Sequence, residues 1–370
     1  MMSKPLLFSF FSGSGLLDLG FEHNGFDIQF VNENHMPFLD AYQYARKKLN
    51  LTSPIHGYNN QSIETFLEGS SKEFLKKITL ESQKCGVVGF MGGPPCPDFS
   101  VGGKNKGAEG DHGKLTKVYI EVIINNMPDF FIFENVKGLW RTAKHREFYE
   151  LMKDNLTNAG YLLTNRLINS IEYGAPQDRD RIILFGVKPS LAKNIENIDS
   201  IFPWAKHLKF DRKILKAPAW PQTDAYEPDS KKIPPESLEN LIALTTQYWF
   251  DKNDVENHFN ANDFFQPRAG LAKFKVIPEG DDSKKSYKRL HRWRYSPTAA
   301  YGNNEVHLHP YKDRRLSVSE ALAIQSLPKE FALPDYMTLS NKFKTIGNGV
   351  PYLAASGLAK TVNEFITNLK

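Results

Sequence analysis

A short apolar run near the amino terminus turns at glycines and then continues with helical spacing. Pro5 to Phe11 has the composition of a strand, Ser12-Gly13-Ser14-Gly15 is the turn, and Leu16 to Phe21 has the pattern of a helix. Strand, glycine turn and helix open a doubly wound α/β fold, in which bare backbone and a helix N-terminus face a ligand. Gly20 comes five positions after Gly15, so the spacing differs from the dinucleotide fingerprint G-x-G-x-x-G. The turn predicts the fold but argues against a bound pyrophosphate.

The next strand candidate ends in polar residues. Ile28 to Val31 is followed by Asn32 and Glu33, and Glu33 lies 18 residues after Gly15. An acid at the tip of the second strand is placed to hydrogen-bond a ribose hydroxyl. A single acidic strand end is also typical of a solvated loop. The segment 37–85 continues the α/β alternation and contains no repeat.

Val87 to Gly103 presents a cysteine in a stiff, glycine-rich loop. An apolar run typical of a buried parallel strand ends at Gly92-Gly93, and two prolines precede Cys96. Prolines fix φ, so we expect the thiol at the carboxyl edge of the sheet, where open α/β folds bind ligands. From this stretch alone, Cys96 is either a nucleophile or a small core residue. The loop that follows, Ser100 to Gly113, is either a lid or a plain connection.

Two later strand ends carry charged side chains. Asp129 to Glu134 is typical of a buried strand, and a carboxylate after four apolar residues costs free energy unless it is paired or protonated. Glu134 is therefore a candidate proton donor. Arg179 and Arg181 are two residues apart at the start of a strand, so both guanidinium groups should project from one face. Two such cations can hold a carbonyl or phosphate, and a solvated sheet edge fits the segment equally well.

The alternation of strands and helices stops around Pro189. The segment 189–310 gains prolines and aromatic residues, which indicates a second domain of irregular structure. Within it, Lys284 to Tyr295 contains six Lys or Arg residues, three interleaved aromatic residues and no acid. Basic residues neutralise phosphates while rings stack on bases, so the run favours nucleic acid over a solvated face. The formal net charge of +5 agrees with a polyanionic partner.

Two helix boundaries and the cellular compartment also follow from the sequence. Ser317-Val-Ser-Glu320 is a capping box that opens a helix to Leu327, and Pro351 begins the last helix. Two cysteines, Cys85 and Cys96, cannot make a disulfide framework, which suits a reducing cytoplasm. The amino-terminal apolar run is too short to span a bilayer. We therefore expect a cytoplasmic protein with no membrane partner.

In order and spacing, these stretches resemble the motif series of the DNA (cytosine-5)-methyltransferase family over nearly the whole chain. The stretches that carry the resemblance are FSFFSGSGLLDLGF, Asn32-Glu33, GGPPCPDFSVGGK, Glu134-Asn135-Val136, Gln177-Asp-Arg179-Asp-Arg181, Arg314 to Glu320 and Gly347-Asn-Gly-Val-Pro351. The resemblance implies a doubly wound, Rossmann-like methyltransferase domain at 1–188. It further implies a smaller, irregular target-recognition domain at 189–335 and a segment at 336–370 that completes the catalytic domain.

The resemblance also implies a reaction, in which a methyl group passes from S-adenosylmethionine to carbon 5 of a cytosine flipped out of double-stranded DNA. Cys96 would attack carbon 6, and Glu134 would protonate or hydrogen-bond ring nitrogen 3 and the exocyclic amine. Arg179 and Arg181 would hold the base carbonyl, with Arg181 as the main base contact, and the loop from Ser100 to Gly113 would close over the base. No metal is implied. The implied cofactor contacts are Phe10, Gly13, Gly15, Leu16, Glu33, Gly92, Pro94, Asn348 and Val350.

Two positions depart from the family pattern. Pro97 follows the nucleophile, where the family commonly has glutamine, and this can alter loop closure or DNA contacts. Gln61-Ser62-Ile63 stands where an aspartate often binds the adenine amine of the cofactor. The second departure bears on cofactor affinity rather than on the chemistry.

Three other functions compete with this interpretation. An RNA (tRNA) cytosine-5 methyltransferase would share the architecture, but the Cys-Phe-Thr segment of that branch is not evident. A non-catalytic DNA-binding regulator has no chemical need for Cys96, Glu134 and Arg181 together, and a nicotinamide dehydrogenase does not fit the glycine spacing. We expect a monomeric prokaryotic modification enzyme of a restriction-modification system, whose target sequence the chain does not reveal.

Overall fold

The computed structural model describes residues 4–95, 111–193, 195, 197–267, 271–299, 301 and 305–369. A seven-stranded sheet in the order β3-β2-β1-β4-β5-β7-β6 forms its centre. The first five strands in the chain run parallel, and β7 is antiparallel to both of its neighbours. The strands are β1 (Leu6–Phe10), β2 (Asp27–Asn32), β3 (Tyr58–Asn59), β4 (Val88–Gly92), β5 (Phe130–Val136), β6 (Leu162–Asn169) and β7 (Asp180–Val187).

The central strands are apolar because both faces of the sheet are covered. Every residue of β4 is buried, as are the first six of β5. Two glycines make room for phenylalanine rings of the neighbouring strand: a Cβ at Gly89 would lie 2.1 Å from the Phe130 ring, and one at Gly186 would lie 2.1 Å from the Phe131 ring. Continuous apolar runs of this kind are typical of doubly covered sheets, as the sequence predicted.

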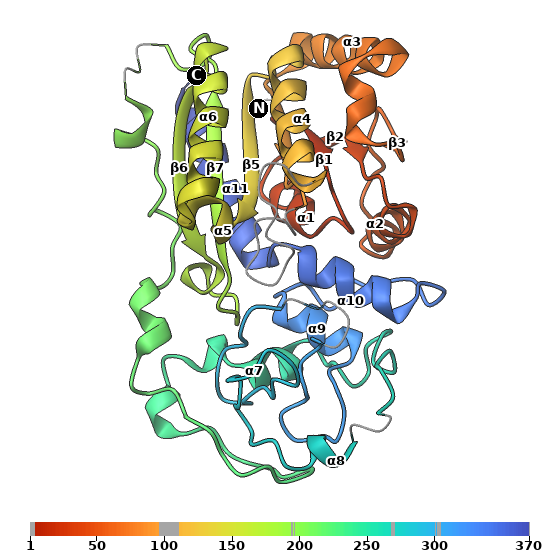
Figure 1. Ribbon diagram of the computed structural model, residues 1–370, viewed down its shortest axis with the longest axis vertical. Coiled ribbons are helices and arrows are strands. Elements are labelled where there is room, and N and C mark those ends of the chain that lie inside the picture. Colours follow the sequence, from red (N-terminus) through yellow and green to blue (C-terminus); the bar gives the residue numbers. More distant parts are fainter. Residues whose placement is uncertain are drawn as a thin grey trace.

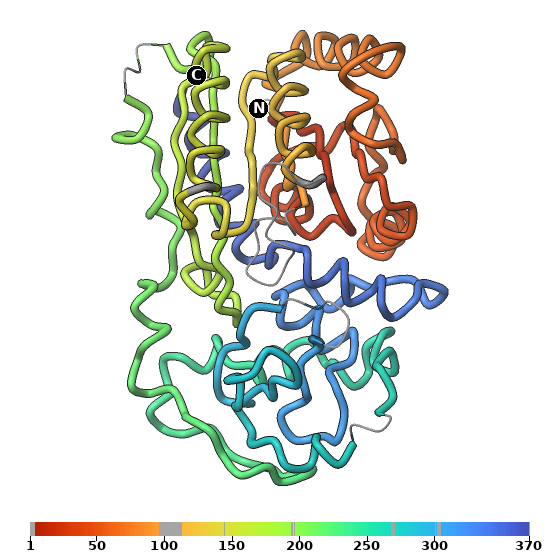
Figure 2. Tube along the Cα trace, viewed as in Figure 1, coloured from red at the N-terminus to blue at the C-terminus, as the bar shows by residue number. Residues whose placement is uncertain are grey.

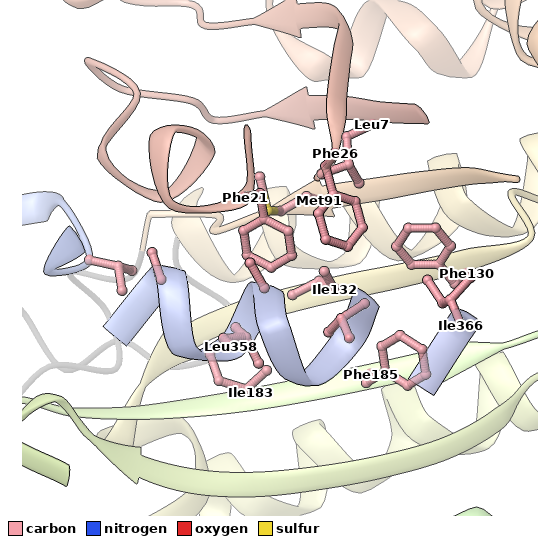
Figure 3. Packing of buried hydrophobic residues seen from close by; sticks show 14 of the residues in the cluster. Leu7, Phe21, Phe26, Met91, Phe130, Ile132, Ile183, Phe185, Leu358 and Ile366 are labelled. Atoms are coloured by element: carbon pink, nitrogen blue, oxygen red, sulfur yellow. The ribbon is translucent and has the colours of Figure 1, made fainter. Parts of the chain in front are cut away.

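Helices cover the two faces of the sheet (Figure 1). Residues of α1 (Leu16–Glu22), α2 (Met36–Lys48) and α11 (Tyr352–Asn368) share one apolar cluster with the sheet. Figure 3 shows Leu358 and Ile366 of α11 in this cluster with Ile132, Ile183 and Phe185. A second cluster, on the other face, contains residues of α3 (Gly69–Cys85), α4 (Asp111–Asn126) and α6 (Ala143–Asn158). This arrangement confirms the predicted doubly wound architecture.

The carboxyl-terminal helix α11 packs so tightly that its single glycine, Gly357, is required. A Cβ at Gly357 would lie 2.1 Å from the Tyr173 ring. Overpacking of this kind costs about 1–3 kcal/mol, whereas alanine in place of glycine gains at most about 1 kcal/mol of helix propensity. We expect Gly357→Ala to lower the free energy of unfolding in urea by about 1–2 kcal/mol. Lys360→Ala, at an exposed position of the same helix, should change it by less than about 0.5 kcal/mol.

After β7 the chain first packs on the sheet, through Ala192, Ile198 and Phe202, and then forms a second lobe with little regular structure, which Figure 2 shows below the sheet. Its helices are short: α7 (Thr246–Lys252), α8 (Leu271–Phe274) and α9 (Val318–Ile324). The predicted capping box is present, because the Ser317 and Glu320 side chains each bond the other residue's backbone N–H. The helix ends at Ile324 rather than Leu327, and α10 (Leu339–Asn348) follows. The remaining α-helix, α5 (Lys137–Arg141), follows β5 directly.

Two of the six basic residues in the run Lys284 to Tyr295 are structural, and for these two the expectation of a nucleic-acid surface is wrong. Arg289 is fully buried and donates to the carbonyls of Ile277 and Lys312. Arg292 is paired with the buried carboxylate of Glu279, at 2.8 Å. The groups that accept hydrogen bonds from these two arginines lie in other segments of the chain. The pattern of residues within the run therefore does not reveal them. Lys284 and Lys285 remain exposed.

His307 gives the second lobe a dependence of stability on pH. Burial, followed by the charge of Lys288, lowers the pKa of His307 to about 3, whereas an unfolded histidine has a pKa of about 6.5. The unfolded chain thus binds more protons between these values, so stability is lost as the pH falls below about 6.5. We expect a loss of about 2 kcal/mol between pH 7 and pH 5 from this residue.

Urea unfolding of the wild type and His307→Phe at both pH values isolates this effect. Phenylalanine keeps a ring against Tyr301, which lies 5.3 Å from the His307 ring centroid. The half-buried His258 and the buried His291 and His309, whose pKa values burial also lowers, remain in both chains. Equal losses of stability in the two chains would refute the role of His307.

Candidate active site

The register of the sheet brings the predicted site residues to one edge. Phe10 at the end of β1 pairs with Asn32 of β2 and with Gly92 of β4. The end of β5 lies beside the start of β7, because β7 is antiparallel and pairs Val136 with Arg181. This is the carboxyl edge of the parallel strands, where open α/β folds bind their ligands.

The glycine turn after β1 is held from its outer side by Glu33. Gly13 and Gly15 have φ values of 56° and 86°, in the left-handed region that favours glycine. The Glu33 carboxylate accepts hydrogen bonds from the backbone N–H of Gly13 and of His35, each at 2.8 Å. Burial raises the pKa of Glu33, and these two hydrogen bonds oppose the shift. Turn and acid therefore form one unit, although they are 20 residues apart.

Glu134 and Arg181 form a buried ion pair at the end of β5. Arg181 Nε lies 2.6 Å from Glu134 Oε1, and the two residues are 9% and 8% exposed. Neither atom makes a well-aligned hydrogen bond, so both keep hydrogen-bonding capacity. At this edge the Arg181 guanidinium can donate hydrogen bonds to a planar polar ligand, and the Glu134 carboxylate can accept them.

The backbone after β4 approaches Glu134 directly. A Cβ at Gly93 would lie 2.6 Å from Glu134 Oε2, which explains the glycine at this position. Asn135 Nδ2 lies 3.5 Å from the carbonyl oxygen of Pro94. The chain that leads to Cys96 therefore passes the Glu134 carboxylate. Cys96 itself lies outside the described residues, as does most of the loop from Ser100 to Gly113, whose last three residues begin α4.

Arg179 has a different environment from Arg181. It is 1% exposed and donates to the carbonyls of Ala299, at 3.1 Å, and Gly347, at 2.7 Å. Burial, together with the charge of Arg181, lowers the pKa of Arg179 well below its usual range. The two arginines therefore do not present a matched pair: Arg179 connects β7 to the second lobe and to α10.

The other predicted cofactor residues differ in accessibility. Phe10 is 1% exposed and packs against the rings of Phe30, Phe66, Phe90 and Tyr119, so only its backbone is placed to meet a ligand. Asn348 is exposed at the end of α10. The side chains of Leu16, Pro94 and Val350 are buried, and Gly92 packs against Tyr119.

The analysis of the sequence missed several residues that hold this edge together. Thr345 Oγ1 donates to Ser14 Oγ at 2.9 Å, so the end of α10 is tied to the glycine turn. A Cβ at Gly349 would lie 2.4 Å from Leu16, and one at Gly347 would lie 2.8 Å from the backbone of Tyr301. In the sequence, only the two glycines of Gly347-Asn-Gly indicated that this segment packs closely against another part of the chain, because a close approach of the backbone requires glycine.

Sequence comparison decides the family of the chain. A sequence model of the C-5 cytosine-specific DNA methylases matches residues 7–364. The chain belongs to this family. The match confirms the family resemblance of the sequence motifs. It also confirms the predicted enzyme class, a C-5 cytosine-specific DNA methyltransferase.

Relatives of this DNA methylase match nearly its whole length. The type II methyltransferase M.NmeDI of Neisseria meningitidis serogroup C is 56% identical over 366 residues, which cover 99% of this chain and 85% of that protein. The type II methyltransferase M.FnuDI of Fusobacterium nucleatum is 28% identical over 369 residues, with coverages of 98% and 95%.

Solved structures confirm the Rossmann-like fold of the methylase. A structure described as a DNA modification methyltransferase encoded within an E. coli prophage has a TM-score of 0.65 at 20% identity, covering 99% of this chain and 100% of that chain. The methyltransferase EhMeth of Entamoeba histolytica has a TM-score of 0.60 at 14% identity, with 99% of each chain covered. Among the described residues, no helix is long and apolar enough to cross a membrane, and no three metal-ligating side chains cluster.

Proposed function

We propose that this methylase transfers a methyl group from S-adenosylmethionine to carbon 5 of a cytosine in a specific duplex DNA sequence, as the modification enzyme of a type II restriction-modification system. The observation that carries the proposal is the buried Glu134–Arg181 pair, 2.6 Å apart, beside the backbone that leads to Cys96. The type II relatives, one of them 56% identical, support the biological setting.

The residues of this edge supply what the reaction needs from a protein. The Cys96 thiolate forms a bond to carbon 6 of cytosine while the electrons of the 5,6 double bond move toward carbon 5. Glu134 donates a proton or hydrogen bond at ring nitrogen 3, which accepts the displaced charge. Arg181 orients Glu134 and donates to the base carbonyl. Once carbon 5 carries the methyl group, loss of its proton to a base, with water as that base, re-forms the 5,6 double bond and expels the Cys96 thiolate, and ring nitrogen 3 gives up any proton that it received.

Arg179 does not contact the base in this proposal but positions the segments around the site. Its guanidinium is occupied by two backbone carbonyls, so we assign it the task of holding the start of β7, and with it Arg181, against α10 and the second lobe. Because the two carbonyls belong to distant parts of the chain, this one side chain fixes three segments around the site.

The glycine turn fits the adenosine part of the cofactor. Glu33 accepts one N–H at each carboxylate oxygen, which leaves lone pairs for ribose hydroxyls. Gly13, Gly15 and Gly92 bring bare backbone to the same edge, with Leu16, Pro94, Asn348 and Val350 around it. S-adenosylmethionine, when bound there, supplies an electrophilic methyl group. Gln61 offers only an amide in place of the family aspartate, so the affinity rests more heavily on Glu33.

We propose the same division into domains as the one expected from the sequence. The segment 1–188 contains the sheet, α10 and α11 of 336–370 pack onto it, and the irregular lobe of 189–335 is the candidate recognition domain. A base stacked in a duplex cannot reach the buried Glu134, so the target cytosine has to leave the helix. We therefore propose that DNA binds between the lobes and that the loop 100–113 covers the flipped base.

Transfer of a labelled methyl group tests the proposed function. The chain is incubated with labelled S-adenosylmethionine and either unmethylated duplex DNA of mixed sequence or transfer RNA. The proposal expects label on carbon 5 of cytosine in DNA and none on RNA. Label on RNA alone would replace it with the RNA methyltransferase function, and binding of DNA without any label would favour the regulator.

A further inference from the structure

A buried carboxylate that takes no part in the chemistry lies directly beneath the glycine turn. Asp18 of α1 is 2% exposed. Its two oxygens accept hydrogen bonds from two different elements, from Ser9 Oγ of β1 at 2.9 Å and from the Tyr42 hydroxyl of α2 at 2.8 Å. A charge in such a place costs free energy, which a purely structural role would not require.

Both donors to Asp18 contact the turn. Ser9 Oγ also lies 3.1 Å from Ser12 Oγ, and Ser12 in turn donates to the carbonyl of Asn32, next to Glu33. The Tyr42 ring lies under Gly15, where a Cβ would come within 2.7 Å of it. Asp18 therefore holds the two side chains that contact the turn, Ser9 and Tyr42. Glu33 accepts a hydrogen bond from the backbone of the turn itself, at Gly13.

We propose that Asp18 is a positioning residue for the cofactor, which sets the conformation of the Gly13–Gly15 turn through Ser9 and Tyr42. The inference rests on the proposed binding of S-adenosylmethionine at this turn. The ionised carboxylate carries no proton, so each of its two oxygens can accept a hydrogen bond from one of the two hydroxyl groups. A neutral side chain at this position must turn one of the two donors away and so shift the turn.

The balance of charges supports this assignment. Burial, opposed by the hydrogen bonds from Ser9 and Tyr42, raises the pKa of Asp18 to about 6. The charged groups that face it are Arg46 of α2 and Glu22 of α1, which form an ion pair at 2.6 Å. Because the pKa of Asp18 is higher in the folded chain than in the unfolded one, the folded chain binds more protons between about pH 4 and pH 6, and stability falls as the pH rises through this range. The molecule therefore carries a destabilising charge at a site that shapes the turn.

The variant Asp18→Asn distinguishes a role in positioning the turn from a role in the stability of the fold. At pH 8 we expect the variant to bind S-adenosylhomocysteine, measured by titration calorimetry, about tenfold more weakly than the wild type, because one charged hydrogen bond is rearranged. Its melting temperature at pH 8 should not fall, since the buried charge is gone. Weaker binding without lower stability is a combination that a structural residue cannot produce.

The dependence on pH provides the second measurement. Between pH 8 and pH 5 the wild type should lose affinity for S-adenosylhomocysteine as Asp18 is protonated, and Asp18→Asn should lose less. Glu33, whose pKa burial also raises, titrates in both chains, so the difference between the chains isolates Asp18. His307→Phe, a change in the second lobe, should bind the probe as the wild type does.

The outcomes distinguish this inference from the proposed function. If the wild type does not bind S-adenosylhomocysteine at all, the proposed cofactor is wrong. If the wild type binds and Asp18→Asn binds equally well with the same pH dependence, Asp18 does not position the turn. If affinity and melting temperature fall together, Asp18 is structural and the inference is overturned.

Discussion

Glu134→Gln should lower the rate of methyl transfer by about 100-fold to 10,000-fold, the usual contribution of a positioned general acid. The amide cannot deliver a proton to ring nitrogen 3 of cytosine. It also leaves Arg181 without its counter-charge, although the side chain fills the same space beside Gly93. The measurement is single-turnover transfer of labelled methyl groups to DNA, with the binding of DNA determined separately.

The opposite end of the same strand provides the matched control. Asp129 precedes β5 and lies 3.7 Å from Lys188, which follows β7, so the two strands carry one carboxylate–cation pair at each end. Asp129→Asn removes a charge of the same kind away from the carboxyl edge. We expect it to retain the rate of the wild type, and equal losses in the two variants would mean that Glu134 acts only on the stability of the sheet.

Cys96→Ala should reduce methyl transfer below detection while the protein still binds DNA. Carbon 5 of cytosine becomes a sufficient nucleophile only when carbon 6 carries the thiolate, so no slower route remains within the same site. Cys85, exposed at the end of α3, is the control. Cys85→Ala should transfer methyl groups at the rate of the wild type, and residual transfer by Cys96→Ala would remove the thiol from the mechanism.

Features that depend on local sequence could be predicted. The glycine turn and the capping box at Ser317 were found where expected, and the second and fifth strands were found with ends one or two residues later than expected, at Asn32 and Val136. φ requirements, apolar runs and caps are properties of a few consecutive residues. The parallel strands then bring Glu33, Glu134 and the chain at Gly92 and Gly93 to one edge without further information.

Features that depend on distant partners could not be predicted. The spacing of Arg179 and Arg181 suggested a matched pair, but the acceptors of Arg179 lie 120 and 168 residues away and turn it into a connection between segments. The basic run around Arg292 resembled a nucleic-acid surface because Glu279, its buried partner, lies outside the run. The proposed role of Asp18 likewise depends on a hydrogen bond from Tyr42, which belongs to another helix.

The most direct test of the account is covalent capture of the target base by Cys96. A pool of random-sequence duplexes with 5-fluorocytosine in place of cytosine is incubated with the protein and S-adenosylmethionine, because a fluorine at carbon 5 cannot leave as a proton and the adduct accumulates. The account predicts a protein–DNA complex that survives denaturation, with the attached nucleotide on Cys96 by mass spectrometry, and no complex with Cys96→Ala. Methylation of ordinary DNA by the wild type, without any such complex on the fluorinated DNA, would contradict it.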